Sequence, residues 1–119
     1  MTQSEDSCYA CAIQETARDG GEVVHARCLY PPDLVRRAPY LRGERHDHAW
    51  VERDGFVYDW QARHPPPVSA TGFYLDRDPV DIRRYTSSEA VELFVRTGHM
   101  GPWTDAEVAA QRAKGRRRA

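Results

Sequence analysis

The sequence predicts an α+β fold in which an N-terminal helix packs on a small antiparallel sheet and two helices follow at the C-terminus. Residues 8–18 contain no glycine or proline and place apolar residues close to helical spacing. Residues 48–60 form two runs of strand-forming residues around an Asp-Gly pair, which is typical of a β-hairpin. Capping-box patterns at 86–89 and 104–107 open two further helices. Strands grouped between helices favour the α+β class.

The order of the expected elements follows from these signals and from the turn formers between them. Gly20 ends the first helix, because glycine readily takes the left-handed conformation. The β-branched residues Val23 and Val24 then begin a strand. The segment 33–45 is irregular or holds one short helical turn. The expected elements are a helix at 8–18, strands at 22–29, 48–52, 56–60, 71–75 and 80–85, and helices that end near Gly98 and Gly115.

Length and composition describe one ordinary globular domain. The chain has 119 residues, of which 40% are hydrophobic and 29% charged, and this length fits a single domain over residues 1–119. No apolar run approaches the roughly 20 residues that cross a bilayer. The polar N-terminal residues do not resemble a signal peptide, so we expect a cytoplasmic protein without a membrane span.

Residues 112–119 form a basic end that we expect to be a flexible tail. They carry five basic side chains, so the rest of the chain has a formal charge of about −6 within a total of −1. A total charge near zero provides no general attraction to nucleic acid. We therefore expect any contact with nucleic acid to be weak and confined to this tail. The oligomeric state has no signal in the sequence.

The hairpin predicts that four side chains share one face of the sheet. A two-residue turn at 54–55 places Trp50 opposite Asp59 and His48 opposite Gln61. Directly opposed residues lie on the same face, as do residues two apart. His48 and Asp59 are then diagonal neighbours, within reach of a hydrogen bond. A three-residue turn would shift the register and separate them.

A carboxylate bonded to one imidazole nitrogen fixes the tautomer and leaves the other nitrogen as a base. This is the requirement for activating a thiol or hydroxyl. Cys8 lies near the start of the first helix, where the positive end of the helix dipole favours a thiolate. We expect Cys11 or Cys28 to be an ordinary core residue. An exposed strand with polar residues on its wet face is the alternative explanation of the His48–Asp59 pair.

This pattern resembles the papain-like and transglutaminase-like cysteine superfamily. The resemblance rests on a cysteine near a helix start, a following strand, then His-Ala-Trp-Val-Glu, a glycine turn and Val-Tyr-Asp, over residues 8–60. It is closest to small bacterial or phage members with a Cys-Tyr-x-Asn-Ala opening. The resemblance implies a papain-like domain that carries out acyl transfer on a peptide, amide or small acyl substrate without a cofactor, as hydrolase or transferase. It assigns Cys8 as nucleophile, His48 as base and Asp59 as orienting acid.

The chain departs from the family pattern at two points. Cys11 stands where the pattern has asparagine, and nothing identifies the donors of an oxyanion hole. Gln3 and Gln14 are candidate donors. Trp50 and Gln61 are candidates for the wall of the site.

Two alternatives to the enzyme remain open. One is a non-catalytic binding or accessory module on the same fold, with the cleft retained for recognition. The other is a small adaptor held by a Cys₃His zinc site from Cys8, Cys11, His25 and Cys28, whose spacing is plausible. The residues after Cys11 read as helix, and an offset of three along a strand places His25 and Cys28 on opposite faces. Both points disfavour zinc, and the primary interpretation involves no metal.

Overall fold

The computed structural model describes residues 5–59 and 66–118, and it confirms the α+β class with an N-terminal helix and two C-terminal helices. The elements are α1 Glu5–Asp19, β1 Glu22–Leu29, α2 Pro32–Arg37, the 3₁₀ helix η1 Pro39–Leu41, β2 Arg45–Arg53, β3 Phe56–Tyr58, β4 Val68–Ser69, α3 Ala70–Arg77, β5 Val80–Thr86, α4 Ser87–Thr97 and α5 Asp105–Arg118.

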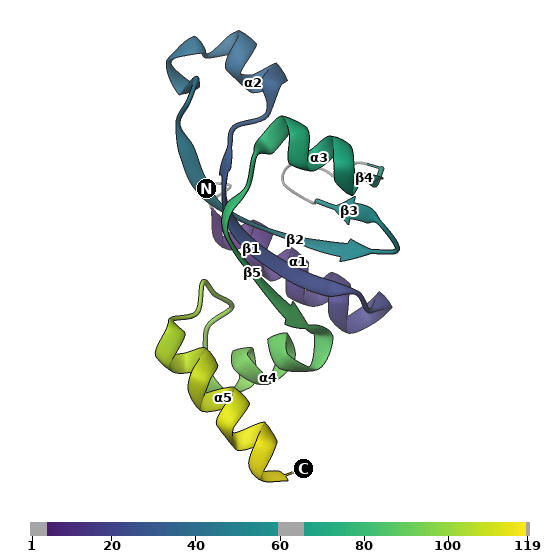
Figure 1. The fold of residues 1–119 in the computed structure, drawn as a ribbon, viewed down its shortest axis with the longest axis vertical. Helices are drawn as coiled ribbons and strands as arrows, with labels where there is room; N and C mark the ends of the chain where they lie inside the picture. Colours follow the sequence, from purple (N-terminus) through teal and green to yellow (C-terminus); the bar gives the residue numbers. More distant parts are fainter. Residues whose placement is uncertain (1–4, 60–65, 119) are drawn as a thin grey trace.

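An antiparallel sheet in the order β4-β3-β2-β1-β5 forms the centre of the fold. Helix α1 covers one face, which we call the α1 face, and α3 covers the other, the α3 face (Figure 1). Ala49 and Val51 of β2 pack on the α1 face with residues of α1, α4 and α5. Trp50 packs on the α3 face against Phe73 of α3. Burial on both sides makes β1 and β2 the core strands of the sheet.

The turn between α1 and β1 requires glycine. Gly20 has a φ of +83° and donates its N–H to the Thr16 carbonyl at 2.9 Å, which ends the helix. Gly21 has a φ of +89°, and a Cβ there would lie 2.7 Å from the Glu52 carbonyl oxygen. The chain therefore passes β2 closely enough to place β1 beside it.

Both expected capping boxes are confirmed. The Glu89 backbone N–H donates to Thr86 Oγ1 at 3.1 Å, and the Glu89 carboxylate accepts from the Thr86 N–H at 3.0 Å. Thr104 and Glu107 make the same two bonds at 3.1 and 2.8 Å. These reciprocal bonds satisfy the free N–H groups that begin α4 and precede α5.

Two sequence expectations are corrected. The segment 71–75 is helical, within α3, and not a strand. Ser69 caps this helix by accepting from the Gly72 N–H at 3.1 Å, and Phe73 and Arg77, four residues apart, are its buried residues. The last helix is also longer than expected, because α5 continues past Gly115 to Arg118. The flexibility of residues 112–119 stays a prediction.

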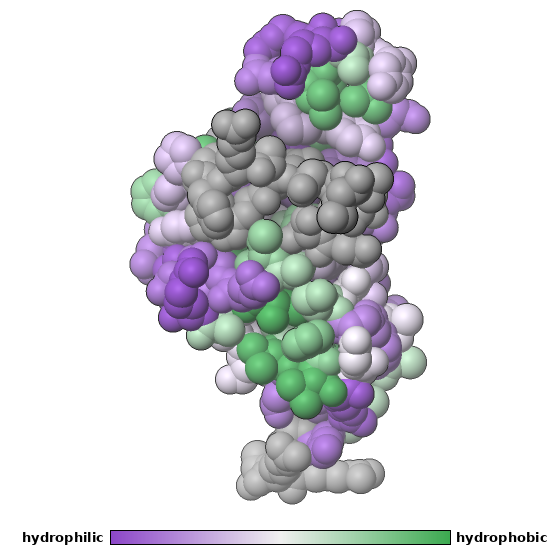
Figure 2. All heavy atoms as spheres, turned by 180° about the vertical axis from the view of Figure 1, so that it is seen from behind, coloured by the Kyte–Doolittle hydropathy of each residue, from purple (hydrophilic) through white to green (hydrophobic). Residues whose placement is uncertain are grey.

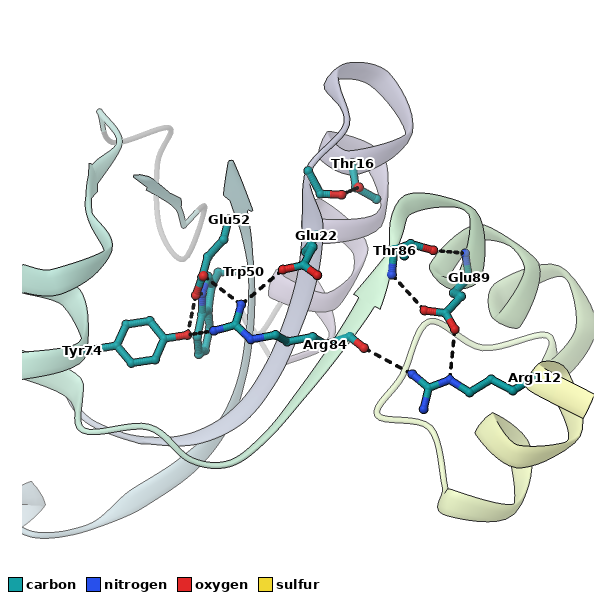
Figure 3. A network of polar contacts seen from close by, with 10 residues as sticks. Thr16, Glu22, Trp50, Glu52, Tyr74, Arg84, Thr86, Glu89 and Arg112 are labelled. Atoms are coloured by element: carbon teal, nitrogen blue, oxygen red, sulfur yellow. Dashed lines mark hydrogen bonds and ion pairs between the residues drawn. The ribbon is translucent and has the colours of Figure 1, made fainter. Parts of the chain in front are cut away.

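Glu52 joins three elements on the α3 face. Its carboxylate accepts from Trp50 Nε1 at 2.9 Å, from the Tyr74 hydroxyl at 2.5 Å and from Arg84 Nη1 at 2.9 Å (Figure 3). Arg84 also donates to the Tyr74 oxygen at 2.7 Å. These bonds hold β2, α3 and β5 together at one end of the sheet. Burial and the Glu52 carboxylate both raise the Tyr74 pKa, so the hydroxyl stays protonated and donates.

We expect Tyr74→Phe to lower the free energy of unfolding by about 1–2 kcal/mol, because Glu52 and Arg84 each lose a partner. Urea denaturation monitored by circular dichroism measures this loss. Tyr40→Phe is the matched control, since Tyr40 is 81% exposed, and it should leave the midpoint unchanged. Equal midpoints for the two variants would show that the Tyr74 hydroxyl contributes nothing to stability.

The molecule is elongated, with α2 at one end and α5 at the other, and its principal extents are 49, 28 and 26 Å (Figure 1). Seen from behind, hydrophobic side chains gather in the lower half, in the region of α4 (Figure 2). Val95 of α4 is among the exposed large hydrophobic residues. None of the described helices is long and apolar enough to cross a membrane.

Candidate functional site

The hairpin register is the one that the sequence predicts. Asp54 and Gly55 both have positive φ, 54° and 80°, as a two-residue turn of the mirror-image type requires. The pairs across the hairpin are Val51–Tyr58, Glu52–Val57 and Arg53–Phe56. Strand β3 ends at Tyr58, so the return strand is shorter than the expected 56–60.

This register brings His48 and Asp59 into contact. His48 Nε2 lies 3.0 Å from Asp59 Oδ2. His48 is 1% exposed, and its ring lies 5.8 Å from that of Trp50, between centroids. The contact that the sequence predicts is therefore present, and it lies on the α3 face beneath neighbouring side chains. The bonded nitrogen is Nε2, which leaves Nδ1 as the second ring nitrogen.

Arg77 of α3 completes a buried polar network around this pair. Its Nη1 lies 3.7 Å from Asp59 Oδ2, its Nε donates to the Leu29 carbonyl at 2.7 Å, and its Nη2 lies 3.3 Å from His46 Nε2. Burial lowers the Arg77 pKa, and the Asp59 charge opposes this shift. Sequence reasoning missed Arg77 because residues 71–75, which precede it in the same helix, were expected to form a strand.

His46 lies at the outer edge of the network. Its ring stacks on Tyr30, with centroids 4.3 Å apart and planes inclined by 17°. Burial lowers the His46 pKa to about 4, and His48 and Arg77 add to that shift, so His46 is neutral at pH 7. Asp59 Oδ1 is buried without a hydrogen-bond partner among residues 5–59 and 66–118. Asp59 is thus a carboxylate that His48 and Arg77 share.

The expected nucleophile lies on the other side of the sheet. Cys8 is buried in the core cluster that includes Ala49 and Val51 of β2. Side chains alternate along a strand, so His48 and Trp50 point to the opposite face, where Trp50 belongs to the other cluster. The structure brings together His48 and Asp59 but places β2 between that pair and Cys8.

The other two cysteines are poor thiolates in this conformation. Cys28 lies on the α3 face, opposite His46 in the register, and is fully buried. Burial raises the Cys28 pKa to about 11, although nearby Arg77 opposes the shift. Burial and the Asp59 charge also raise the pKa of Cys11. Both thiols are therefore protonated near neutral pH, whereas a nucleophilic cysteine needs a lowered pKa.

No family model, curated protein or solved structure matches this chain. The resemblance to the papain-like superfamily therefore remains a prediction from residues 8–60. The candidate oxyanion and wall residues Gln3 and Gln61 lie outside the described residues, and Gln14 is exposed on α1.

The structure does not bring together Cys8, Cys11, His25 and Cys28, the four ligands of the alternative zinc site. His25 and Cys28 lie on opposite faces of β1, as their offset of three predicts, and their strand partners are Ala49 and His46. Among the described residues, no group of three or more histidine, cysteine or acidic side chains is arranged to hold a metal ion.

A pocket of about 380 Å³ opens on the α1 face, away from the His48–Asp59 pair. His25 lines it and contacts three aromatic rings, with centroid distances of 4.6 Å to Tyr9, 5.1 Å to Tyr85 and 5.1 Å to Trp103. Burial lowers the His25 pKa to about 3, so the imidazole is neutral at pH 7. The sequence offered no signal for this pocket, because its lining comes from α1, three strands and the segment before α5.

Proposed function

We propose that this chain is a non-catalytic binding module, in which the His48–Asp59 pair stabilises the fold. The alternation of side chains along β2 carries the proposal. It assigns Cys8 and His48 to opposite faces of the sheet. A base must lie within hydrogen-bond reach of the thiol that it deprotonates, and the intervening strand prevents this.

Side-chain rotation cannot bring the two groups together. Moving His48 to the α1 face requires a one-residue slip of β2, which would also expose Trp50 and reverse every other side chain of the strand. Trp50 is 1% exposed and packs on Phe73, so such a slip would disrupt the core. The buried polar side chains on the α3 face instead contact one another, as buried groups that serve structure commonly do, although Asp59 Oδ1 has no hydrogen-bond partner among the described residues.

Thiol labelling tests the proposal. We expect Cys8 and Cys28 to react with iodoacetamide at neutral pH at least about tenfold more slowly than in the unfolded chain, because both are buried. Cys11, which is partly exposed, should react first. Mass spectrometry of the digested protein gives the rate for each cysteine.

His48→Asn separates a catalytic from a structural role in the same assay. The asparagine variant keeps a polar side chain and removes the base. With a structural role, the labelling rate of Cys8 in the native protein does not fall. A Cys8 that reacts faster than free cysteine in the wild type, and loses this reactivity in His48→Asn, would overturn the binding-module proposal.

The acyl-transfer enzyme is a second candidate, and one observation favours it. The 3.0 Å contact between His48 and Asp59 is the one that the family resemblance requires. This candidate needs a conformation in which Cys8 reaches His48. A burst of p-nitrophenolate from p-nitrophenyl acetate, with one equivalent per chain and lost in Cys8→Ser, would support it.

A further inference from the structure

We propose that the pocket on the α1 face binds a small organic cation with a flat apolar body, of the arylalkylamine class, and that Asp81 pairs with its positive charge. The assignment rests on the proposal that the chain is a binding module. It concerns the opposite side of the sheet from the His48–Asp59 pair, so each can be tested separately.

The size and walls of the pocket fit a flat apolar group. A volume of about 380 Å³ lies within the usual range for small-molecule sites. Tyr9, Tyr85 and Trp103 contribute aromatic rings to the lining, and the Tyr85 and Trp103 rings meet edge to face at 5.0 Å. Aromatic rings favour contact with other flat rings and also attract cations to their faces. The three side chains are 1–3% exposed, so a ligand contacts only the small part of each that faces the pocket.

The charges of the lining favour a cation over an anion. Arg27 Nε lies 3.8 Å from Asp47 Oδ1, and Arg83 is paired with Asp105. Asp81 also lines the pocket, and within the described part of the chain it has no cation within ion-pair distance. The lining therefore has one carboxylate more than its two guanidinium groups, and His25 is neutral at pH 7. Arg83 attracts Asp81 only at longer range, so Asp81 is the carboxylate of the lining that makes no ion pair with a described residue and is open to a ligand.

A bulge in the sheet positions Asp81. His25 pairs with Arg83 and Arg27 pairs with Val80, so Asp81 and Ile82 of β5 stand opposite the single residue Ala26. Asp81 has a φ of +54°, in the left-handed region that aspartate tolerates better than most residues other than glycine. Bulges redirect side chains at the edges of sheets, and β5 is an edge strand.

Buried polar atoms near the aromatic walls add hydrogen-bonding capacity. Neither ring nitrogen of His25 nor the Tyr85 hydroxyl has a hydrogen-bond partner in the described part of the chain, and both residues line the pocket. A neutral imidazole offers one donor and one acceptor, and a hydroxyl offers both. Acceptors of this kind suit an ammonium group, which brings three N–H donors and accepts none.

Titration with phenethylamine tests the assignment, with ¹H–¹⁵N NMR spectra of the full chain as the readout. Two analogues keep the phenylethyl body and change the charged group: 2-phenylethanol is neutral and 3-phenylpropionate is anionic. We expect phenethylamine to shift the Trp103 indole and the backbone signals of Asp81 and Tyr85, with binding that weakens as salt rises. The alcohol should bind about fivefold more weakly, and the anion more weakly still.

Asp81→Asn is the decisive variant, because asparagine also tolerates the left-handed backbone. It should weaken phenethylamine about fivefold and leave 2-phenylethanol unchanged. The matched control is Asp76→Asn, an exposed aspartate of α3 on the other face of the sheet, which should change neither affinity.

Three results would overturn the assignment: shifts confined to other parts of the molecule, equal or tighter binding of 3-phenylpropionate, or an unchanged affinity in Asp81→Asn. Tyr85→Phe provides a further check that does not alter charge, and it should weaken phenethylamine and 2-phenylethanol equally through loss of the hydroxyl. If phenethylamine does not bind but Cys8 is labelled slowly, the ligand class is rejected and the binding-module proposal stands. Fast labelling of Cys8 that depends on His48 would reject the binding module itself.

Discussion

We expect Asp59→Ala to lower the free energy of unfolding by about 3–5 kcal/mol, because removing one partner of a buried ion pair leaves the other charge uncompensated. The Arg77 side chain is 6% exposed and that of His48 is 2% exposed. Without Asp59 the guanidinium keeps its bonds to the Leu29 carbonyl and His46 but loses its buried carboxylate, and the exposed Asp76 remains as an acidic neighbour. Urea denaturation of the two proteins at pH 7 measures the loss.

The control is an exposed ion pair of the same residue types. Asp33 and Arg36 of α2 form an i,i+3 pair whose side chains are 80% and 71% exposed, and Asp33→Ala should not change the midpoint measurably. Replacing both buried charges, in Asp59→Ala with Arg77→Met, should recover part of the loss, because no unpaired charge remains. An Asp59→Ala variant as stable as Asp33→Ala would contradict a structural role for the network.

The hairpin could be predicted because its determinants are local. Asp54 and Gly55 accept positive φ and fix a two-residue turn, and the turn fixes which residues face each other. The contact between His48 and Asp59 then follows from the alternation of side chains alone. The capping boxes at Thr86 and Thr104 are equally local, and they too were confirmed.

The position of Cys8 relative to His48 depends on information that a local pattern does not contain. His48, Ala49, Trp50 and Val51 are all buried, because β2 is covered on both faces. A strand buried on both faces shows no alternation between apolar and polar residues. Nothing in this run shows which face α1 covers, so helix position and resemblance alone placed Cys8 beside His48.

Arg77 and the pocket residues escaped prediction for a related reason. Arg77 acquires its partners from β1, β2 and the residue after β3, up to 48 positions away in the sequence. Asp81 and His25 come together through a bulge between two strands that are far apart in the chain. Such sites form only when the sheet is assembled, and each residue by itself resembles an ordinary helix or strand residue.

The other large effect that we expect is a loss of stability in acid caused by His25. Its pKa is lowered to about 3 in the folded protein, against about 6.5 in an unfolded chain. Between these values the unfolded state binds more protons, so stability rises with pH in this window. The contribution is fully present above pH 6.5 and falls by on the order of 4 kcal/mol as the pH drops to 3.

Measuring between pH 7 and 5 isolates the histidines, because carboxyl groups with ordinary pKa values stay ionised there. About half of the His25 effect falls in this range. His46, with its pKa lowered to about 4, acts in the same direction, but it is only half-buried and solvent screens its charge.

His25→Phe keeps a ring among Tyr9, Tyr85 and Trp103, and it should flatten the dependence of the urea midpoint on pH. His46→Asn should flatten it less. A slope that survives unchanged in His25→Phe would show that groups other than His25 cause it, and would contradict the lowered pKa of the buried imidazole as its source.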